Sequence, residues 1–174
     1  MIFQQETILT LSIADKFLSK ENLLQAFNSV AAKKGSPGVD GESIEDFRKN
    51  LRANISQLRD EIINNKYQPL PHKGVLIGKG NGEFREIRIP TVRDRIVQHA
   101  LLNVLHPLVE PSFSEVSFAY RPNLSYIDAV KEVAKARDAG YQWVLDADIT
   151  KFFDNIDHQR LLVEVRKFVE HPGI

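Results

Sequence analysis

Cysteine is absent from the 174-residue chain, which excludes disulfide bonds and thiolate metal sites. Long apolar runs are absent too, and no segment approaches the roughly 20 residues that a membrane-spanning helix needs. The N-terminus lacks the basic and then apolar pattern of a signal peptide. We therefore expect a cytoplasmic protein with no membrane partner.

An excess of charge of either sign is also missing, because 23 basic residues balance 23 acidic ones. That balance by itself does not predict nucleic-acid binding. The distribution is less even, since residues 66–95 hold seven Lys and Arg against three acidic residues. Such a basic stretch is suited to contact phosphates, although a solvated surface is the commoner outcome of a modest excess.

The composition that remains is that of an ordinary globular protein, with 43% apolar and 26% charged residues. A chain of this length holds one core, or one domain and the start of a second. Neither an internal repeat nor a low-complexity segment is present. Prolines and serines interrupt the helical periodicity between Pro107 and Tyr120, which marks a candidate domain boundary.

Several helices are predicted from a capping residue followed by apolar residues three and four positions apart. Ser19 begins the first of them. Ser43 begins a longer one that extends to Ile62. Another starts at Thr91, and we expect it to end near Pro107 because the residue before a proline disfavours helix.

The second half of the chain adds two helices, which begin at a Ser125–Asp128 capping box and at Asp157. Two short apolar runs, 75–77 and 87–89, flank a glycine-rich tip and predict a β-hairpin. A further strand is predicted over 143–148. The expected fold class is therefore α+β.

The densest chemistry lies at the end of that last strand, where four aspartates and two phenylalanines follow an apolar run. Alternation places Asp146 and Asp148 on one side of the strand. A carboxylate at a strand end suits Mg²⁺, which takes one or two carboxylates together with substrate phosphates. Spacing alone equally allows Asp148 to cap the following turn.

Residues 148–158 (DITKFFDNIDH) closely resemble the first catalytic motif of reverse transcriptases of the group II intron-encoded type. Three upstream segments resemble other blocks of that family, in the family's order. These are 35–41 (GSPGVDG), 85–98 (REIRIPTVRDRIVQ) and 117–125 (SFAYRPNLS). The resemblance implies helix-rich fingers with a β-hairpin, followed by the first strand and helix of a polymerase palm.

The resemblance implies roles for three residues of the catalytic motif. Asp148 would be a ligand of both catalytic Mg²⁺ ions, and the Ile149 carbonyl would help to hold them. Phe153 would lie under the sugar of the incoming nucleotide, where its ring would exclude a 2′-hydroxyl and so favour deoxynucleotides. Without the resemblance, Phe153 is equally well interpreted as a core residue beside Phe152.

The resemblance also implies roles for two hairpin residues and for one turn residue. Lys79 and Arg85 would approach the triphosphate of the dNTP and balance its charge. Arg121 is a candidate nucleic-acid contact, although we interpret it first as the residue that fixes a turn near the template–primer.

Three further arginines, Arg88, Arg93 and Arg95, are candidates for contacts with the template. Their alternative is structural, as ion-pair partners of Glu86 and Asp94. Both interpretations stay open, because charge spacing in a sequence does not distinguish a phosphate contact from an internal ion pair.

The resemblance divides the chain into an N-terminal extension (1–18), a fingers-like region (19–116) and an incomplete start of the palm (117–174). Transfer by two metals needs more than one carboxylate. The family's other carboxylates belong to a downstream Tyr-Ala-Asp-Asp-like hairpin, which these 174 residues do not contain. We expect the 174 residues alone to be inactive, and the complete enzyme to bind an RNA template, a DNA primer and dNTP.

Two other interpretations stay open from the sequence. The chain is suited to a non-catalytic, maturase-like RNA-binding module that uses the basic 66–95 stretch. It is also compatible with an α+β interaction domain in which Asp148 is only a cap. Within the family, intron, CRISPR-associated and phage-defence settings share these blocks, and neither the setting nor the oligomeric state is predicted.

Overall fold

A computed structural model describes residues 12–78, 80 and 82–169. These form two compact units, of which the first extends to Leu105 and the second begins at His106. The predicted boundary at 116/117 concerns the fingers and the palm and stays a prediction. None of the helices in the described residues is long and apolar enough to cross a membrane.

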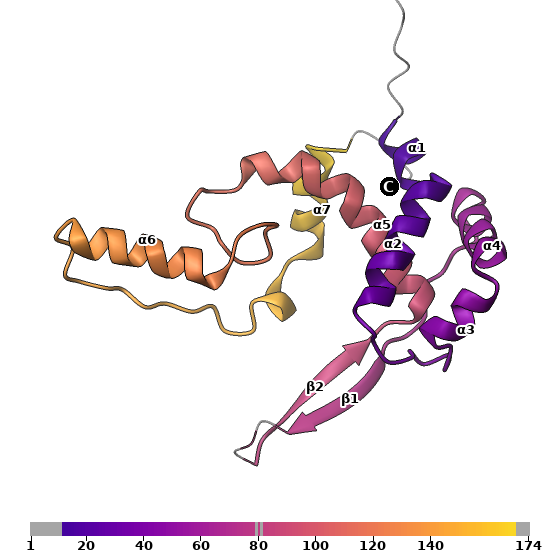
Figure 1. The fold of residues 1–174 in the computed structure, drawn as a ribbon, viewed down its shortest axis with the longest axis horizontal. Coiled ribbons are helices and arrows are strands. Elements are labelled where there is room, and N and C mark those ends of the chain that lie inside the picture. Colours follow the sequence, from indigo (N-terminus) through magenta and orange to yellow (C-terminus); the bar gives the residue numbers. More distant parts are fainter. Residues whose placement is uncertain (1–11, 79, 81, 170–174) are drawn as a thin grey trace, which may run out of the picture. The chain divides into compact units, whose positions relative to one another are not determined.

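The first unit contains helices and one hairpin, shown in Figure 1. Helix α5 begins in this unit and ends in the second. The elements in chain order are α1 (Ile13–Phe17), α2 (Lys20–Ala32), α3 (Ile44–Lys49), α4 (Leu51–Ile63), β1 (Lys73–Gly78), β2 (Phe84–Ile89) and α5 (Val92–Val109).

The predicted helix starts at Ser19 and Ser43 are confirmed, and in each case the serine hydroxyl accepts a backbone N–H three residues later. The helix expected to run unbroken from Ser43 to Ile62 is instead two helices, α3 and α4. The break is at Asn50, whose backbone leaves the helical region (φ −122°, ψ 35°). The Asn54 side chain donates to the Phe47 carbonyl at 2.9 Å and so satisfies a group near this break.

The core of the first unit lies between α2, α4 and α5. Phe27 is fully buried and stacks on Phe47, with 5.7 Å between ring centroids. Burial of each such side chain contributes about 1.5–3 kcal/mol. The buried faces are formed by Leu23, Ala26, Phe27, Val30, Ile44, Phe47, Ile55, Leu58, Ile96 and Ala100. Except for Ala26, these residues lie at the three- and four-residue apolar spacing that predicted the helices.

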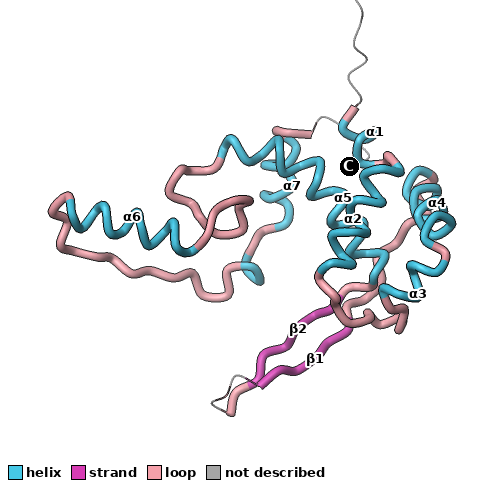
Figure 2. The backbone as a smooth tube through the Cα atoms, in the orientation of Figure 1, coloured by secondary structure: helices cyan, strands magenta, loops and turns pink. Residues whose placement is uncertain are grey.

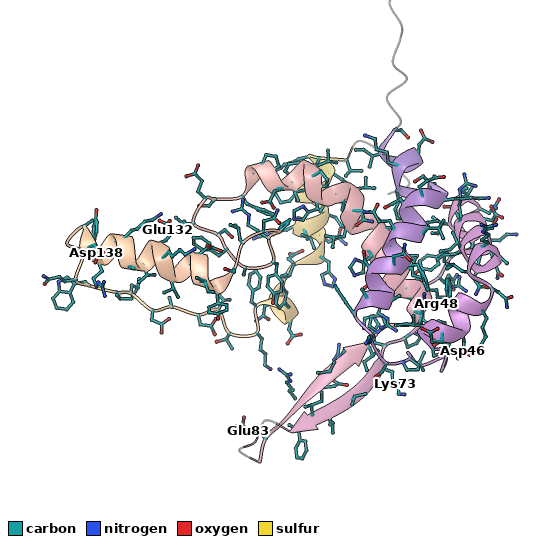
Figure 3. All side chains as sticks on the ribbon, in the orientation of Figure 1. Asp46, Arg48, Lys73, Glu83, Glu132 and Asp138 are labelled. Carbon is teal, nitrogen blue, oxygen red and sulfur yellow. The ribbon has the colours of Figure 1, made fainter. Side chains whose placement is uncertain are left out.

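The predicted hairpin is confirmed as an antiparallel pair in which Lys73 pairs with Ile89 and Gly78 with Phe84. Figure 2 shows the two strands extending away from the helices of the first unit. None of the strand side chains is buried. Lys73 lies at the base of the hairpin and Glu83 at its far end (Figure 3).

The second unit is helical, with η1 (Glu110–Ser112), α6 (Tyr126–Asp138), η2 (Phe153–Asn155) and α7 (His158–Arg166). The expected end of α5 near Pro107 is wrong, because the helix continues to Val109 with Pro107 inside it. His106 Nε2 lies 3.2 Å from Glu110 Oε2, one turn further on, but neither buried atom makes a hydrogen bond within the described residues.

The strand predicted over 143–148 is not formed, and residues 141–149 have no regular secondary structure. A strand needs a hydrogen-bonded neighbour, and the sheet of the described residues contains only β1 and β2. The apolar side chains of the segment are correspondingly exposed, with Trp143 96% and Leu145 92% accessible. The fold class is α+β as predicted, since helices accompany the hairpin.

The predicted Ser125–Asp128 pair does begin α6. Asp128 accepts hydrogen bonds from the Ser125 hydroxyl at 2.6 Å and from the Ser125 backbone N–H at 3.0 Å. The Ser125 hydroxyl, the Lys131 ammonium and the Ser125 N–H together hold the pKa of Asp128 at about 2, below the usual 3.8.

A pH dependence of α6 follows from this lowered pKa. The folded state binds the Asp128 proton less tightly than the unfolded chain, so the stabilisation is present above pH 3.8 and is lost as the pH falls towards 2. NMR titration of the Asp128 carboxyl carbon should give a midpoint near 2, and Ser125→Ala should move it upward. A wild-type midpoint near 3.8 would contradict the capping contact.

Candidate nucleotide and nucleic-acid site

The predicted metal ligand Asp148 lies in the exposed segment between α6 and η2. Within the part of the chain that the structure describes, no donor contacts its carboxylate. The residues between Asp148 and η2 are held by hydrogen bonds. The Asn155 side chain donates to the Thr150 carbonyl at 2.9 Å. The Asn155 N–H also donates to the Lys151 carbonyl at 3.1 Å. A hydrogen-bonded turn over residues 150–155 therefore follows the exposed Asp148 carboxylate.

The interpretation of Asp148 as a capping residue is not supported by these contacts. The next α-helix, α7, is capped by Asp157, whose side chain accepts the N–H groups of Gln159 and Arg160, as the sequence predicted for that residue. The Asp148 carboxylate is free to meet a ligand from solution.

The metal-binding donors of this segment are hard oxygen atoms, among them the Asp148 carboxylate and the neighbouring Ile149 carbonyl. Such donors suit a divalent cation of the magnesium type. Among the described residues, no group of three His, Cys, Asp or Glu side chains could hold a metal ion. The described residues therefore do not form a complete metal centre around Asp148.

Phe153, the predicted sugar contact, lies on η2 and is 66% exposed, so its interpretation as a core residue is wrong. Its ring meets Phe152 edge-on at 5.3 Å and Tyr120 edge-on at 6.2 Å between centroids. Tyr120 has an unusual positive φ of 61°. Sequence patterns could not pair Tyr120 with Phe153, because the two residues are 33 positions apart.

The structure describes one of the two hairpin residues predicted to meet the triphosphate. Arg85 lies on β2 opposite Ile77, and its side chain is exposed. Lys79 lies outside the described residues. Arg88 is two positions from Glu86 on the same face of β2, and the two side chains form an exposed ion pair at 3.4 Å. The alternative of an Arg88–Glu86 ion pair is therefore confirmed, although an exposed pair of this kind is weak.

Arg93 and Arg95 are held by the protein, but not by the predicted partner Asp94. The Arg93 guanidinium pairs with Glu61 of α4 and lies over the Tyr67 ring, 5.8 Å from its centroid. Arg95 donates to the Ser36 carbonyl at 2.9 Å. The predicted ion pairs of these two arginines with Asp94 are wrong, and their contacts with a template stay a prediction.

The loop 35–41 packs against the first turn of α5. Gly38 is buried there, and a Cβ atom at this position would lie only 2.6 Å from the Thr91 Cα atom. Together with the bond from Arg95 to Ser36, this close approach fixes the loop to α5. The GVDG block therefore has a structural reason for its buried glycine.

Arg121 fixes a turn, as we expected from the sequence. Its guanidinium donates to the Ser114 and Ser117 carbonyls, both at 2.8 Å, and pairs with Glu110 at 2.8 Å. The predicted contact with nucleic acid stays untested. Sequence reasoning missed Glu110, because its partner lies 11 positions away in a turn of no recognisable type.

A family model described as "Reverse transcriptase (RNA-dependent DNA polymerase)" matches residues 77–173, which is more than half of the chain. The chain therefore belongs to the reverse transcriptase family, as its motifs predicted. This is a family of nucleotidyltransferases that generally use a divalent metal and act on a nucleic-acid template with nucleotide substrates.

The relatives place the chain with group II intron proteins. It is 37% identical over 153 residues to "Protein YkfC" of Escherichia coli (strain K12), a match that covers 84% of the chain and 40% of that relative. It is 31% identical over 141 residues to "Group II intron-encoded protein LtrA" of Lactococcus lactis subsp. cremoris, covering 79% of the chain and 23% of LtrA. A third, the "Putative COX1/OXI3 intron 1 protein" of Saccharomyces cerevisiae, is 27% identical over 153 residues, covering 87% and 18%. The chain thus spans less than half the length of these curated relatives.

Proposed function

We propose that the chain forms the fingers and the first palm segment of an RNA-directed DNA polymerase, and that it binds an RNA template, a DNA primer and a dNTP. The observation that carries this proposal is the exposed Asp148 carboxylate, which no described residue pairs with, in the catalytic motif of a chain that belongs to the reverse transcriptase family. The exposed Phe153 lies five residues later in the same motif.

The metal in this proposal is Mg²⁺, because Asp148 and the Ile149 carbonyl offer hard oxygen donors and the substrate would add phosphate oxygens. When bound, the ions would activate the attacking hydroxyl and stabilise the leaving pyrophosphate. Asp148 would hold a metal beside the triphosphate. One carboxylate does not complete a two-metal site, so the 174 residues alone should not catalyse transfer.

Two side chains would select and hold the nucleotide. The Phe153 ring, with its edge-on partner Tyr120, would form an aromatic wall against the sugar. Such a wall leaves no room for a 2′-hydroxyl. Arg85 would offer its exposed guanidinium to the triphosphate, where a fixed cation offsets negative charge.

The proposal is tested with the 174-residue chain by measuring its affinity for two ligands, an RNA template annealed to a DNA primer and a structured RNA without a primer. We expect binding to the template–primer duplex that weakens as salt is raised, because phosphate contacts release counterions. Preference for the structured RNA would favour the maturase-like alternative instead. The chain is also similar to two nuclear intron maturases of Arabidopsis thaliana, at 28% identity over 96 residues and 39% over 64 residues, so this second outcome is worth resolving.

Catalysis is tested with the same 174-residue chain. Primer extension with dNTPs and Mg²⁺ should give no product above background. Robust synthesis by these 174 residues would refute the proposal that Asp148 is one part of a larger metal site. Loss of binding at low salt to both ligands would refute the nucleic-acid function itself.

A further inference from the structure

The base of the β1–β2 hairpin is organised around a buried charge. The carboxylate of Asp94, in the first turn of α5, is only 2% exposed. Burial of a carboxylate is costly unless hydrogen bonds satisfy it. Three groups donate to Asp94: the Tyr67 hydroxyl at 2.6 Å, the Thr91 hydroxyl at 2.7 Å and the Leu70 backbone N–H at 3.2 Å.

These donors come from both legs of the hairpin. Leu70 precedes the first strand residue, Lys73, by three positions, and Thr91 follows the last strand residue, Ile89, by two. Asp94 therefore joins the chain that enters the hairpin to the chain that leaves it. The Asp94 carboxylate thus connects the segment before β1 to the segment after β2 at the base of the hairpin.

The leg that enters the hairpin has few other backbone donors to offer. Pro69 and Pro71 lack an N–H, so Leu70 carries the only one between positions 69 and 71. That N–H is committed to Asp94. The prolines also fix φ on either side of Leu70, which stiffens the segment on which Asp94 acts.

The Tyr67 hydroxyl keeps its proton and so remains a hydrogen-bond donor to Asp94. Burial is the larger cause that raises the pKa of the Tyr67 phenol above its usual value, and the hydrogen bond to Asp94 is the second. The Tyr67 ring is in turn covered by the Arg93 guanidinium, which is paired with Glu61 of α4. The contact at Asp94 is therefore anchored to the helical part of the first unit.

The strands themselves give the hairpin little further support. Their side chains are at most half-buried, and the apolar Leu76 and Phe84 are 69% and 67% exposed. A two-stranded hairpin is marginally stable in water without packing against other elements. Its direction must therefore be set at its base.

We propose that Asp94, with Tyr67 as its principal donor, is a positioning pair that sets the direction of the β1–β2 hairpin relative to α4. The pair does not touch substrate. It acts by positioning the hairpin that carries Arg85. Any effect on nucleotide and template contacts therefore rests on the proposed function of Arg85.

The direction of the hairpin is measured directly by spin labelling, which the absence of cysteine makes simple. Cysteines at the exposed positions Leu76 on β1 and Ala53 on α4 (L76C and A53C) carry nitroxide labels, and electron spin resonance gives the distance distribution between them. The parent chain should show one narrow distance. Tyr67→Phe and Asp94→Asn should each abolish it and give a broad distribution.

The control is Glu86→Gln, which breaks the exposed Arg88 ion pair on β2 but leaves the base of the hairpin intact. It should keep the narrow distance. Thermal unfolding, measured in parallel, separates positioning from stability, because a merely structural role would lower the unfolding temperature and leave the distance of the folded molecules unchanged. If Asp94→Asn does not fold, Tyr67→Phe decides the question, since it keeps the ring over which Arg93 lies.

A narrow, parent-like distance in folded Tyr67→Phe would overturn the proposal. Template–primer affinity, measured on the same variants, distinguishes this failure from failure of the proposed function. A parent chain that binds no template–primer contradicts the proposed function while the distance measurement still stands. Parent-like binding together with a broad distance would show that the hairpin direction does not govern substrate contacts.

Discussion

Simultaneous replacement of Arg85 and Arg88 by glutamate should lower the affinity of the chain for a template–primer duplex at least about tenfold at physiological salt. Both side chains are exposed on β2, and the double variant changes the local charge by about four units at the surface proposed to meet phosphates. The exposed Glu86 already reduces the positive charge of this strand, so the reversal leaves it strongly acidic.

Fluorescence anisotropy with a labelled primer, recorded over a series of salt concentrations, measures the effect. The salt dependence should become shallower in the variant, because fewer counterions are released. A matched control reverses Lys20 and Arg52, which are exposed on α2 and α4 and lie outside the 66–95 stretch. An equal loss in the control would show that only net charge matters and that the hairpin is not the contact.

Gly38→Ala should destabilise the first unit by about 2–3 kcal/mol, as expected when a buried position is overpacked. The added methyl group would lie 2.6 Å from the Thr91 Cα atom and 2.8 Å from its backbone nitrogen. Backbone atoms do not move aside as a flexible side chain does. The loop would have to leave α5, and the Arg95 bond to Ser36 would be lost with it.

Urea unfolding followed by circular dichroism measures this change. Gly41→Ala serves as the comparison in the same loop, because an added Cβ meets nothing within 4 Å there and only the positive φ of 73° opposes the substitution. It should cost about 1 kcal/mol. Equal destabilisation by the two variants would mean that backbone conformation, and not the contact with Thr91, determines the glycine at position 38.

The parts of the fold that depend on short-range signals could be predicted from the sequence. Ser19, Ser43 and Asp157 begin helices because a capping side chain acts within three residues, and buried Phe27 lies at the apolar spacing of three to four residues that predicted the first of these helices. The hairpin was readable for the same reason, since its two strands are separated by a short glycine-rich segment.

The errors arose where the outcome depends on distant or absent partners. The apolar run at 143–148 has strand composition, yet no neighbouring strand pairs with it in the described residues. Pro107 stays inside α5 although local preference disfavours helix there. Periodicity also continued across Asn50, where the chain in fact turns.

The candidate site was predicted unevenly for related reasons. The motif predicted Asp148 and Phe153 as site residues, and both are exposed in the structure. The partners of the arginines could not be read from the sequence, because Glu61 is 32 positions from Arg93 and Ser36 is 59 from Arg95. The hydrogen bond between Tyr67 and Asp94, 27 positions apart, could not be read from the sequence for the same reason.

The exposed Trp143 has a practical consequence for studying this protein. It is the only tryptophan of the chain, it is 96% accessible, and it lies five residues before Asp148. Its emission therefore reports on the surroundings of the 148–158 motif without interference from any other indole. A blue shift would signal that a polypeptide or nucleic acid has covered this segment, whereas rearrangements among α2, α4 and the early part of α5 would contribute no indole signal of their own.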